Sequence, residues 1–189
     1  VGGWGGHGFS QLGDGTTTNP RPWPVFATGI TSASAVDAGS SHALALLTDG
    51  TVVGWGQNNA GQIGDGSTTG RTVPTPVPGL TNAVAVSAGS GFSLAVTADG
   101  TAWSWGGNGN GQLGTGNTTA RSTPDTVPGL TNVRAVAAGT FTSYFLMADG
   151  TVRAVGSNAG GAGAGGALGN GTSGGQSLTP VTVSGLTNV

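Results

Sequence analysis

Short apolar runs separated by Gly-rich polar stretches recur along the whole chain. The clearest set lies at 84–89, 92–96 and 101–105, where Val, Leu, Ala and aromatic residues dominate. Short runs of this kind, bounded by Gly, are typical of β-strands. Helix-breaking Gly is frequent, and the strong surface helix formers Glu and Lys are absent from the chain. The pattern therefore predicts an all-β fold.

An Asp-Gly pair follows the second apolar run of each unit. The pairs are Asp49-Gly50, Asp99-Gly100 and Asp149-Gly150. Asp-Gly between two strands favours a two-residue type I′ hairpin, because that turn needs positive φ at both central residues. Such a turn at Asp49-Gly50 places Leu44 opposite Trp55. The other units contain equivalent bulky pairs: Leu94 with Trp105, and Tyr144 with Val155. We therefore expect one large cross-strand pair in the core of every unit.

Several landmarks repeat at intervals of about 50 residues, which is the signature of a repeat architecture. Trp-Gly occurs at 4–5, 55–56 and 105–106, with Val155-Gly156 in the fourth place. Gly-Leu-Thr-Asn occurs at 79–82, 129–132 and 185–188, with a degenerate copy at 29–32. The expected units are approximately 1–50, 51–100, 101–150 and 151–189. The last unit is truncated and carries a Gly/Ala insertion around Gly160 to Ala167.

A fourth apolar run in each unit contains Pro, at Pro24, Pro74 and Pro124. Pro lacks the backbone N–H of a central strand, so this run is expected to form an edge strand. Four short strands in each tandem unit describe a blade of a β-propeller. We therefore predict a single propeller segment over 1–189, built of four-stranded blades of about 50 residues.

The strand count predicts about 3.5 blades. The chain contains the last two strands of one blade, three complete blades, and the first residue of a further strand, because Val189 corresponds to Val133. Propellers typically close with four to eight blades. We therefore expect the chain to be part of a larger ring, or other chains to complete it.

The repeat resembles that of the regulator of chromosome condensation family. The stretch Trp55 to Gly66, which runs Trp-Gly-x-Asn-x-x-Gly-Gln-Ile-Gly-Asp-Gly, carries most of the resemblance, together with the Pro-Val run and Ala88-Gly89. The resemblance implies a propeller that usually has seven blades. Members of the family include a nucleotide-exchange factor for a small GTPase and a bacterial β-lactamase inhibitor. The fourth unit departs from the pattern, with Val155 at the Trp position, Ala167 at the Gln position and Gln176 at the Arg position.

The composition excludes several classes of function. Charged residues make up 6% of the chain and the formal net charge is −2. Five scattered Arg and no Lys provide no basic patch, so we expect no nucleic-acid binding and no binding to acidic membrane surfaces. No apolar run is long enough for a membrane-spanning helix, and the absence of Cys excludes disulfides. A Lys-free surface rich in Ser, Thr, Gly and Ala favours an extracellular or cell-surface location.

Candidate catalytic or metal-binding groups are few. His7 occupies a position held by Asn in other units, and His42 one held by Phe92 or Thr142, so the two are not expected to converge on a metal. The Asp65 position becomes Thr115 and Asn170, whereas calcium loops need several carboxylates in one segment. The Gly-x-Gly runs lack the Lys of a phosphate-binding loop. We therefore predict no enzyme activity, no cofactor and no metal site.

Two further groups of residues have both a structural and a binding interpretation. Arg21, Arg71 and Arg121 recur at one position of the repeat. They either bond loop carbonyls or an Asp such as Asp14 or Asp65, which is the favoured interpretation, or form a ring of ligand-binding groups. Trp23 and Phe26 have no counterpart in the other units, and packing or capping is favoured over an exposed contact.

Two functions follow from these observations. The leading hypothesis is a non-catalytic structural or protein-interaction module of a bacterial surface or extracellular assembly, with a protein partner or self-association. Low charge and near-identical units motivate it. The alternative is a ligand-binding module that recognises a glycan or a target enzyme through its blade loops, where binding residues concentrate in such scaffolds.

Overall fold

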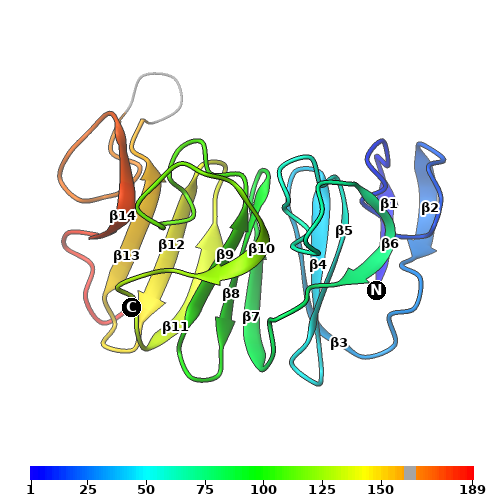
Figure 1. The fold of residues 1–189 in the computed structure, drawn as a ribbon, viewed down its shortest axis with the longest axis horizontal. Coiled ribbons are helices and arrows are strands. Elements are labelled where there is room, and N and C mark those ends of the chain that lie inside the picture. Colours follow the sequence, from blue (N-terminus) through cyan, green and yellow to red (C-terminus); the bar gives the residue numbers. More distant parts are fainter. Residues whose placement is uncertain (160–164) are drawn as a thin grey trace.

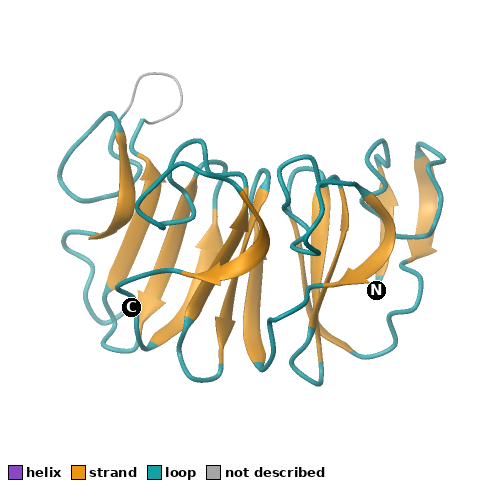
Figure 2. Cartoon of the chain, viewed as in Figure 1, coloured by secondary structure: helices purple, strands orange, loops and turns teal. Residues whose placement is uncertain are grey.

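The computed structural model describes residues 1–159 and 165–189, and the described residues form strands and loops without a helix (Figure 2). Blade 1 contains β1 (Gly2–Gly5) and β2 (Arg21–Phe26). Blade 2 contains β3 (Ala33–Ala38), β4 (His42–Leu47), β5 (Val52–Gly56) and β6 (Arg71–Pro76). Blade 3 contains β7 (Ala83–Ala88), β8 (Phe92–Thr97), β9 (Ala102–Gly106) and β10 (Arg121–Thr126). Blade 4 contains β11 (Val133–Ala138), β12 (Thr142–Met147), β13 (Val152–Ser157) and β14 (Gln176–Thr182).

The four blades follow one another in a row along the chain (Figure 1). Each complete blade is an antiparallel sheet whose strands pair in chain order. The Pro-bearing strand lies at one edge of every sheet, as predicted. The first strands of successive blades contact one another, β3 with β7 and β7 with β11, so they line the inner side of the row. The predicted all-β propeller architecture is confirmed.

The predicted pairing of Leu44 with Trp55 is wrong by one residue. Trp55 lies opposite Ala43, and Leu44 lies opposite Gly54. The loop contains three residues rather than two, since the Leu47 amide donates to the Thr51 carbonyl at 2.8 Å. Only the last of its residues, Gly50, has a positive φ, of 80°. A three-residue hairpin that ends in a left-handed Gly accepts the Asp-Gly sequence as readily as the type I′ turn. The other two predicted pairs are displaced in the same way: Leu94 pairs with Ser104, and Tyr144 with Ala154.

The corrected register explains how the blades pack. A large residue pairs with a small one, so Leu44 and Trp55 point to opposite faces of blade 2. Trp55 faces blade 1, where its Nε1 donates to the Gln11 carbonyl at 2.8 Å. Leu44 faces blade 3 and shares a buried cluster with Trp105. The core of the molecule therefore consists of these layers between blades. Burial of each such large apolar side chain contributes about 1.5–3 kcal/mol to stability.

The fourth blade keeps the plan of the others, with one correction. Gly56 pairs with Arg71 in blade 2, and the equivalent Gly156 pairs with Ser177. Ser177, and not Gln176, therefore occupies the Arg position. The insertion predicted around Gly160 to Ala167 falls partly outside the described residues, since 160–164 belong to it.

Candidate functional site

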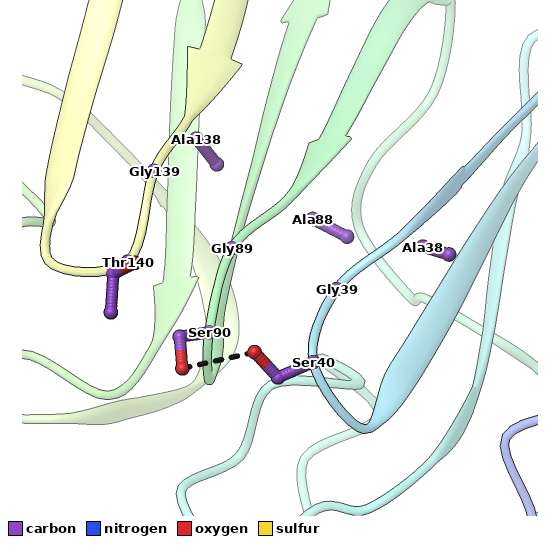
Figure 3. A pocket seen from close by; sticks show the side chains of 9 residues that line it. All are labelled: Ala38, Gly39, Ser40, Ala88, Gly89, Ser90, Ala138, Gly139 and Thr140. Atoms are coloured by element: carbon purple, nitrogen blue, oxygen red, sulfur yellow. Dashed lines mark hydrogen bonds between the residues drawn. The ribbon is translucent and has the colours of Figure 1, made fainter. Parts of the chain in front are cut away.

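The turns that join the first and second strands of blades 2, 3 and 4 meet at a shared, open surface pocket of about 400 Å³, which we call the turn pocket (Figure 3). Each turn contributes Ala, Gly and a hydroxyl residue in the same order. The lining residues are Ala38, Gly39, Ser40, Ala88, Gly89, Ser90, Ala138, Gly139 and Thr140. The same three positions of the repeat, from three successive blades, therefore line the pocket.

Glycine at the centre of the turns of blades 2 and 3 allows the three turns to stack. A Cβ atom on Gly39 would overlap the carbonyl oxygen of Gly89. A Cβ atom on Gly89 would lie 2.8 Å from the carbonyl oxygen of Gly139. Because backbone atoms occupy this space, no larger residue fits without moving a blade, and the pocket floor is formed by main chain.

The rim of the pocket is neutral and rich in hydroxyl groups. Ser40 and Ser90 point toward each other, with their Oγ atoms 3.1 Å apart in a hydrogen bond (Figure 3). Thr140 continues the row, and the residue after it, Phe141, is half-exposed. The lining therefore offers hydroxyl groups but no charge.

Asp37, the residue before Ala38 of the pocket lining, holds the inner strands together through hydrogen bonds to blade 3. Its Oδ2 accepts hydrogen bonds from Ser87 Oγ at 3.0 Å and from the Ala88 amide at 2.8 Å. Ser87 Oγ in turn accepts from the Ala138 amide at 3.1 Å. This chain of bonds links blades 2, 3 and 4 directly behind the pocket.

His42 lies buried between blades 2 and 3. Its Nε2 is 2.9 Å from Ser93 Oγ, and that hydroxyl donates its proton to the Gln62 carbonyl at 2.7 Å. His42 must therefore donate from Nε2, which leaves Nδ1 as an acceptor without a partner among the described residues. Burial lowers the pKa of His42 to about 4, against a smaller opposing effect of Asp37. The ring is sealed from solvent, so we assign it a packing role.

His7 is a buried loop residue that replaces a structural Asn. In blade 2, Asn58 accepts from the Ile63 amide and donates to the carbonyls of Ser67 and Thr69. In blade 1, His7 Nδ1 accepts from the Leu12 amide at 3.2 Å, and Nε2 donates to the Thr16 carbonyl at 2.8 Å. The two ring nitrogens thus satisfy the same loop that the amide satisfies elsewhere.

The recurrent Arg residues form ion pairs, which favours their structural interpretation. Arg21 NH2 lies 2.7 Å from Asp14, and Arg71 NH2 lies 2.5 Å from Asp65. Burial of Asp65 opposes its ionisation, but hydrogen bonds from Ser67 and the charge of Arg71 outweigh this and hold its pKa below 3.8. Thr115 replaces the Asp in blade 3, and Arg121 there pairs with Asp125.

The Asp residues of the Asp-Gly turns accept hydrogen bonds within those turns. Asp49 Oδ1 accepts from the Thr51 amide at 2.9 Å and from its hydroxyl at 2.6 Å, and these bonds lower the pKa of Asp49. Within the part of the chain that the structure describes, no three His or Asp side chains come together as metal ligands. The described residues also include no helix that is long and apolar enough to cross a membrane.

Two surface features were not predicted from the sequence. Trp23 and Phe26 are 79% and 76% exposed, so neither packs among the described residues, contrary to the favoured interpretation. The turn pocket was also missed. Its only signal in the sequence is Ala-Gly followed by Ser or Thr at 38–40, 88–90 and 138–140, which does not by itself indicate that the three turns meet.

Comparison with known proteins identifies the family of the repeat. A family model described as "Regulator of chromosome condensation (RCC1) repeat" matches 49–96 and 99–146, just over half of the chain. A second model of the same description matches 33–62, 83–112 and 133–162. The Arabidopsis thaliana protein "Ultraviolet-B receptor UVR8" is 36% identical over 72 residues, which is 38% of this chain and 16% of that protein. The human "Probable E3 ubiquitin-protein ligase HERC4" is 36% identical over 73 residues, 38% of this chain and 7% of that protein.

Solved structures show the same fold over nearly the whole chain. Human WBSCR16 superposes with a TM-score of 0.78 at 23% identity, covering 96% of this chain and 46% of its own. Prp20p from Saccharomyces cerevisiae gives 0.79 at 23% identity, with 95% and 45% coverage. Yeast RCC1 (Prp20) bound to Kap60 gives 0.78 at 23% identity, with 95% and 43% coverage. The chain thus spans less than half the length of the structures it matches. On the evidence of its repeats and its blades, the chain belongs to the regulator of chromosome condensation (RCC1) repeat family.

Proposed function

We propose that this chain is a non-catalytic protein-interaction module whose binding face is the turn pocket and the turns around it. The observation that carries the proposal is the continuity of this surface across three blades. Ser40, Ser90 and Thr140 form one neutral hydroxyl row, and Phe141, the residue after Thr140, is half-exposed. An aromatic anchor next to groups that satisfy backbone hydrogen bonds is the arrangement that concentrates binding energy at protein interfaces.

The chemistry of the surroundings supports binding over catalysis. Proton transfer requires a titratable group within reach of a ligand. His42 is sealed between blades, and Asp37 is engaged by Ser87 and Ala88. The pocket lining itself holds only Ala, Gly, Ser and Thr. Two solved structures of one yeast protein, Prp20, are named for protein partners, Kap60 in one and Gsp1p and histones in the other, which supports a protein as the class of partner here.

A photo-crosslinker placed at Thr140 in the full chain tests the proposal in an extract of the native source. Capture of a defined protein should fall at least tenfold when Phe141 is changed to Ala, because the aromatic anchor is lost. Leu186→Ala is the matched control, since Leu186 is about equally exposed but lies at the opposite ends of the strands. Equal capture by all three proteins would contradict the proposed face.

A glycan is the second candidate ligand, and the hydroxyl row is the observation that favours it. Ser and Thr hydroxyls beside an aromatic ring can bond and stack on a sugar. We further propose, from the composition alone, that the protein acts outside the cell or at its surface. Binding on a glycan array that Phe141→Ala abolishes would favour the sugar over the protein partner. Immunolabelling of intact cells tests the location.

A further inference from the structure

The hairpin that joins β8 to β9 differs from the equivalent hairpins of blades 2 and 4 at two positions that contact each other. The indole Nε1 of Trp103 donates to Thr97 Oγ1 at 3.2 Å, and that hydroxyl donates to Asp99 Oδ1 at 2.7 Å. Thr97 therefore fixes the Trp103 ring beside the carboxylate. The other two hairpins lack both residues and have Leu47 with Val53, and Met147 with Arg153.

A surface pocket of about 330 Å³ lies beside this ring, and we call it the Trp103 pocket. Gly79, Thr81 and Asn82, from the segment that leads into blade 3, line it together with Asp99 and Trp103. It lies at the opposite ends of the strands from the turn pocket, because the β8–β9 turn follows β8 and the β7–β8 turn precedes it. Blade 3 has a blade on each side, since β7 contacts both β3 and β11. The volume is at the lower end of the range for small-molecule sites, about 300–1,000 Å³, and suits one small ring.

The Trp103 pocket combines an aromatic ring with polar groups that are free to bond a ligand. Trp103 packs in part against the core shared by blades 2 and 3, and the rest of its side chain lines the pocket. Asp99 Oδ1 accepts from the Thr97 hydroxyl and the Thr101 amide, whereas Oδ2 accepts from no described residue. These bonds lower the pKa of Asp99, so its carboxyl group is ionised at neutral pH. The Asn82 side chain is exposed, and its amide bonds no described residue.

We propose that the Trp103 pocket binds one sugar residue of a glycan, with a face of the sugar ring on Trp103 and its hydroxyls bonded to Asp99 and Asn82. The face of an aromatic ring is negative and attracts the C–H groups of a sugar. A carboxylate accepts from hydroxyls, and an amide both donates to them and accepts from them. A cation is disfavoured, because the pocket has a single ring and an ion pair with the exposed Asp99 contributes little. The proposal does not rest on the protein-binding function proposed for the turn pocket.

Titration of the 15N-labelled 189-residue protein with the methyl glycosides of glucose, galactose, mannose and N-acetylglucosamine tests the proposal. The indole N–H signal of Trp103 is identified by its absence from Trp103→Val, a variant that copies Val53 of blade 2. At least one glycoside should shift this signal saturably in the unmodified protein. Trp103→Val should weaken the binding of that glycoside by about tenfold in ligand-observed NMR, because the stacking surface is lost.

Asn82→Gly keeps the test independent of how well Trp103→Val folds. Asn82 has a φ of 56°, which Gly adopts readily, so this change removes only the amide and should weaken binding roughly threefold. Asn132→Gly is the matched control in blade 4, at a φ of 58° and without the Trp, and should leave binding unchanged.

Three results would overturn the proposal. They are failure of all four glycosides to bind, binding that Trp103→Val leaves intact, and tighter binding of tetramethylammonium than of any glycoside, which would make the pocket a cation site. None of these measurements uses Thr140 or Phe141, so the outcome at the Trp103 pocket is separate from that of the function proposed for the turn pocket.

Discussion

The layer between blades 2 and 3 and the layer between blades 3 and 4 are filled in different ways. In the first, Trp105 on β9 fills the space next to the small Ala95 of β8. In the second, Val155 replaces the Trp, and the residue equivalent to Ala95 is Phe145, which is fully buried. On this face, the large residue lies on the third strand of blade 3 (β9) but on the second strand of blade 4 (β12). The fourth blade is therefore specialised, and the repeat requires a filled volume more than a particular residue.

The largest effect is expected at Phe145. Phe145→Ala removes the residue that compensates for the missing Trp, so it should cost about 3–5 kcal/mol of unfolding free energy. Val155→Trp alone should destabilise the protein by overpacking. The double variant rebuilds the Trp and Ala arrangement of blade 3 and should be more stable than Phe145→Ala alone. Urea unfolding of the four proteins measures this coupling.

The compensation would be refuted by additive effects. If the double variant lost as much stability as the two single variants together, Phe145 and Val155 would not share one volume. One hydrogen bond is the same in both layers: the Ser93 hydroxyl donates to the Gln62 carbonyl, and the Ser143 hydroxyl donates to the Gln112 carbonyl. The difference between the layers is therefore confined to the apolar residues.

A smaller effect is expected from His42, where the layer between blades 2 and 3 carries a titratable group and the next layer carries Phe92. The pKa of His42 in the folded state is about 4, below its ordinary 6.5, because the charged ring is disfavoured by burial. The unfolded chain therefore binds more protons between these values, and stability is lost as the pH falls from about 6.5 to about 4. The loss amounts to about 3 kcal/mol.

His42→Phe copies blade 3 and should remove this loss. Thermal or urea unfolding of both proteins between pH 7 and pH 4 measures it. Asp14, Asp49 and Asp65 have lowered pKa values, so their contribution is lost at still lower pH and is common to both proteins. Parallel pH profiles for the wild type and His42→Phe would show that His42 is protonated without cost in the folded state.

The features that the sequence could predict are those that a single unit determines. Local patterns predict the strand lengths, the Pro-bearing edge strand and the four-stranded blade. Each pattern recurs about every 50 residues, which strengthens the prediction. The predicted register was wrong because Asp49-Gly50 suits hairpin loops of two and of three residues. In blade 3 the large core residue is Trp105 on β9, and in blade 4 it is Phe145 on β12. This difference could not be predicted, because the two side chains pack against different neighbouring blades. The turn pocket was not predicted because it depends on contacts between units, such as the close approach of the Gly89 carbonyl oxygen to Gly39.

The smallest effect is expected in the loops that follow the Trp strand, where blades 2 and 3 again solve one problem differently. Asp65 accepts from Ser67 and pairs with Arg71, whereas in blade 3 Thr115 and Asn117 hold the loop without a carboxylate. Exchanging Asp65→Thr and Ser67→Asn together should cost less than about 1 kcal/mol, because partly exposed ion pairs contribute little.

Asn58→Ala is the contrasting change in the same loop. Its amide bonds the Ile63 amide and the Ser67 and Thr69 carbonyls and is buried, so its loss leaves backbone groups unsatisfied and should cost about 1–3 kcal/mol. Unfolding in urea at neutral pH compares the two variants. Because His7 performs the same task in blade 1, Asn58→His should be tolerated better than Asn58→Ala. A loop that tolerated Ala as well as His would show that the ion pair, and not the buried amide, maintains its shape.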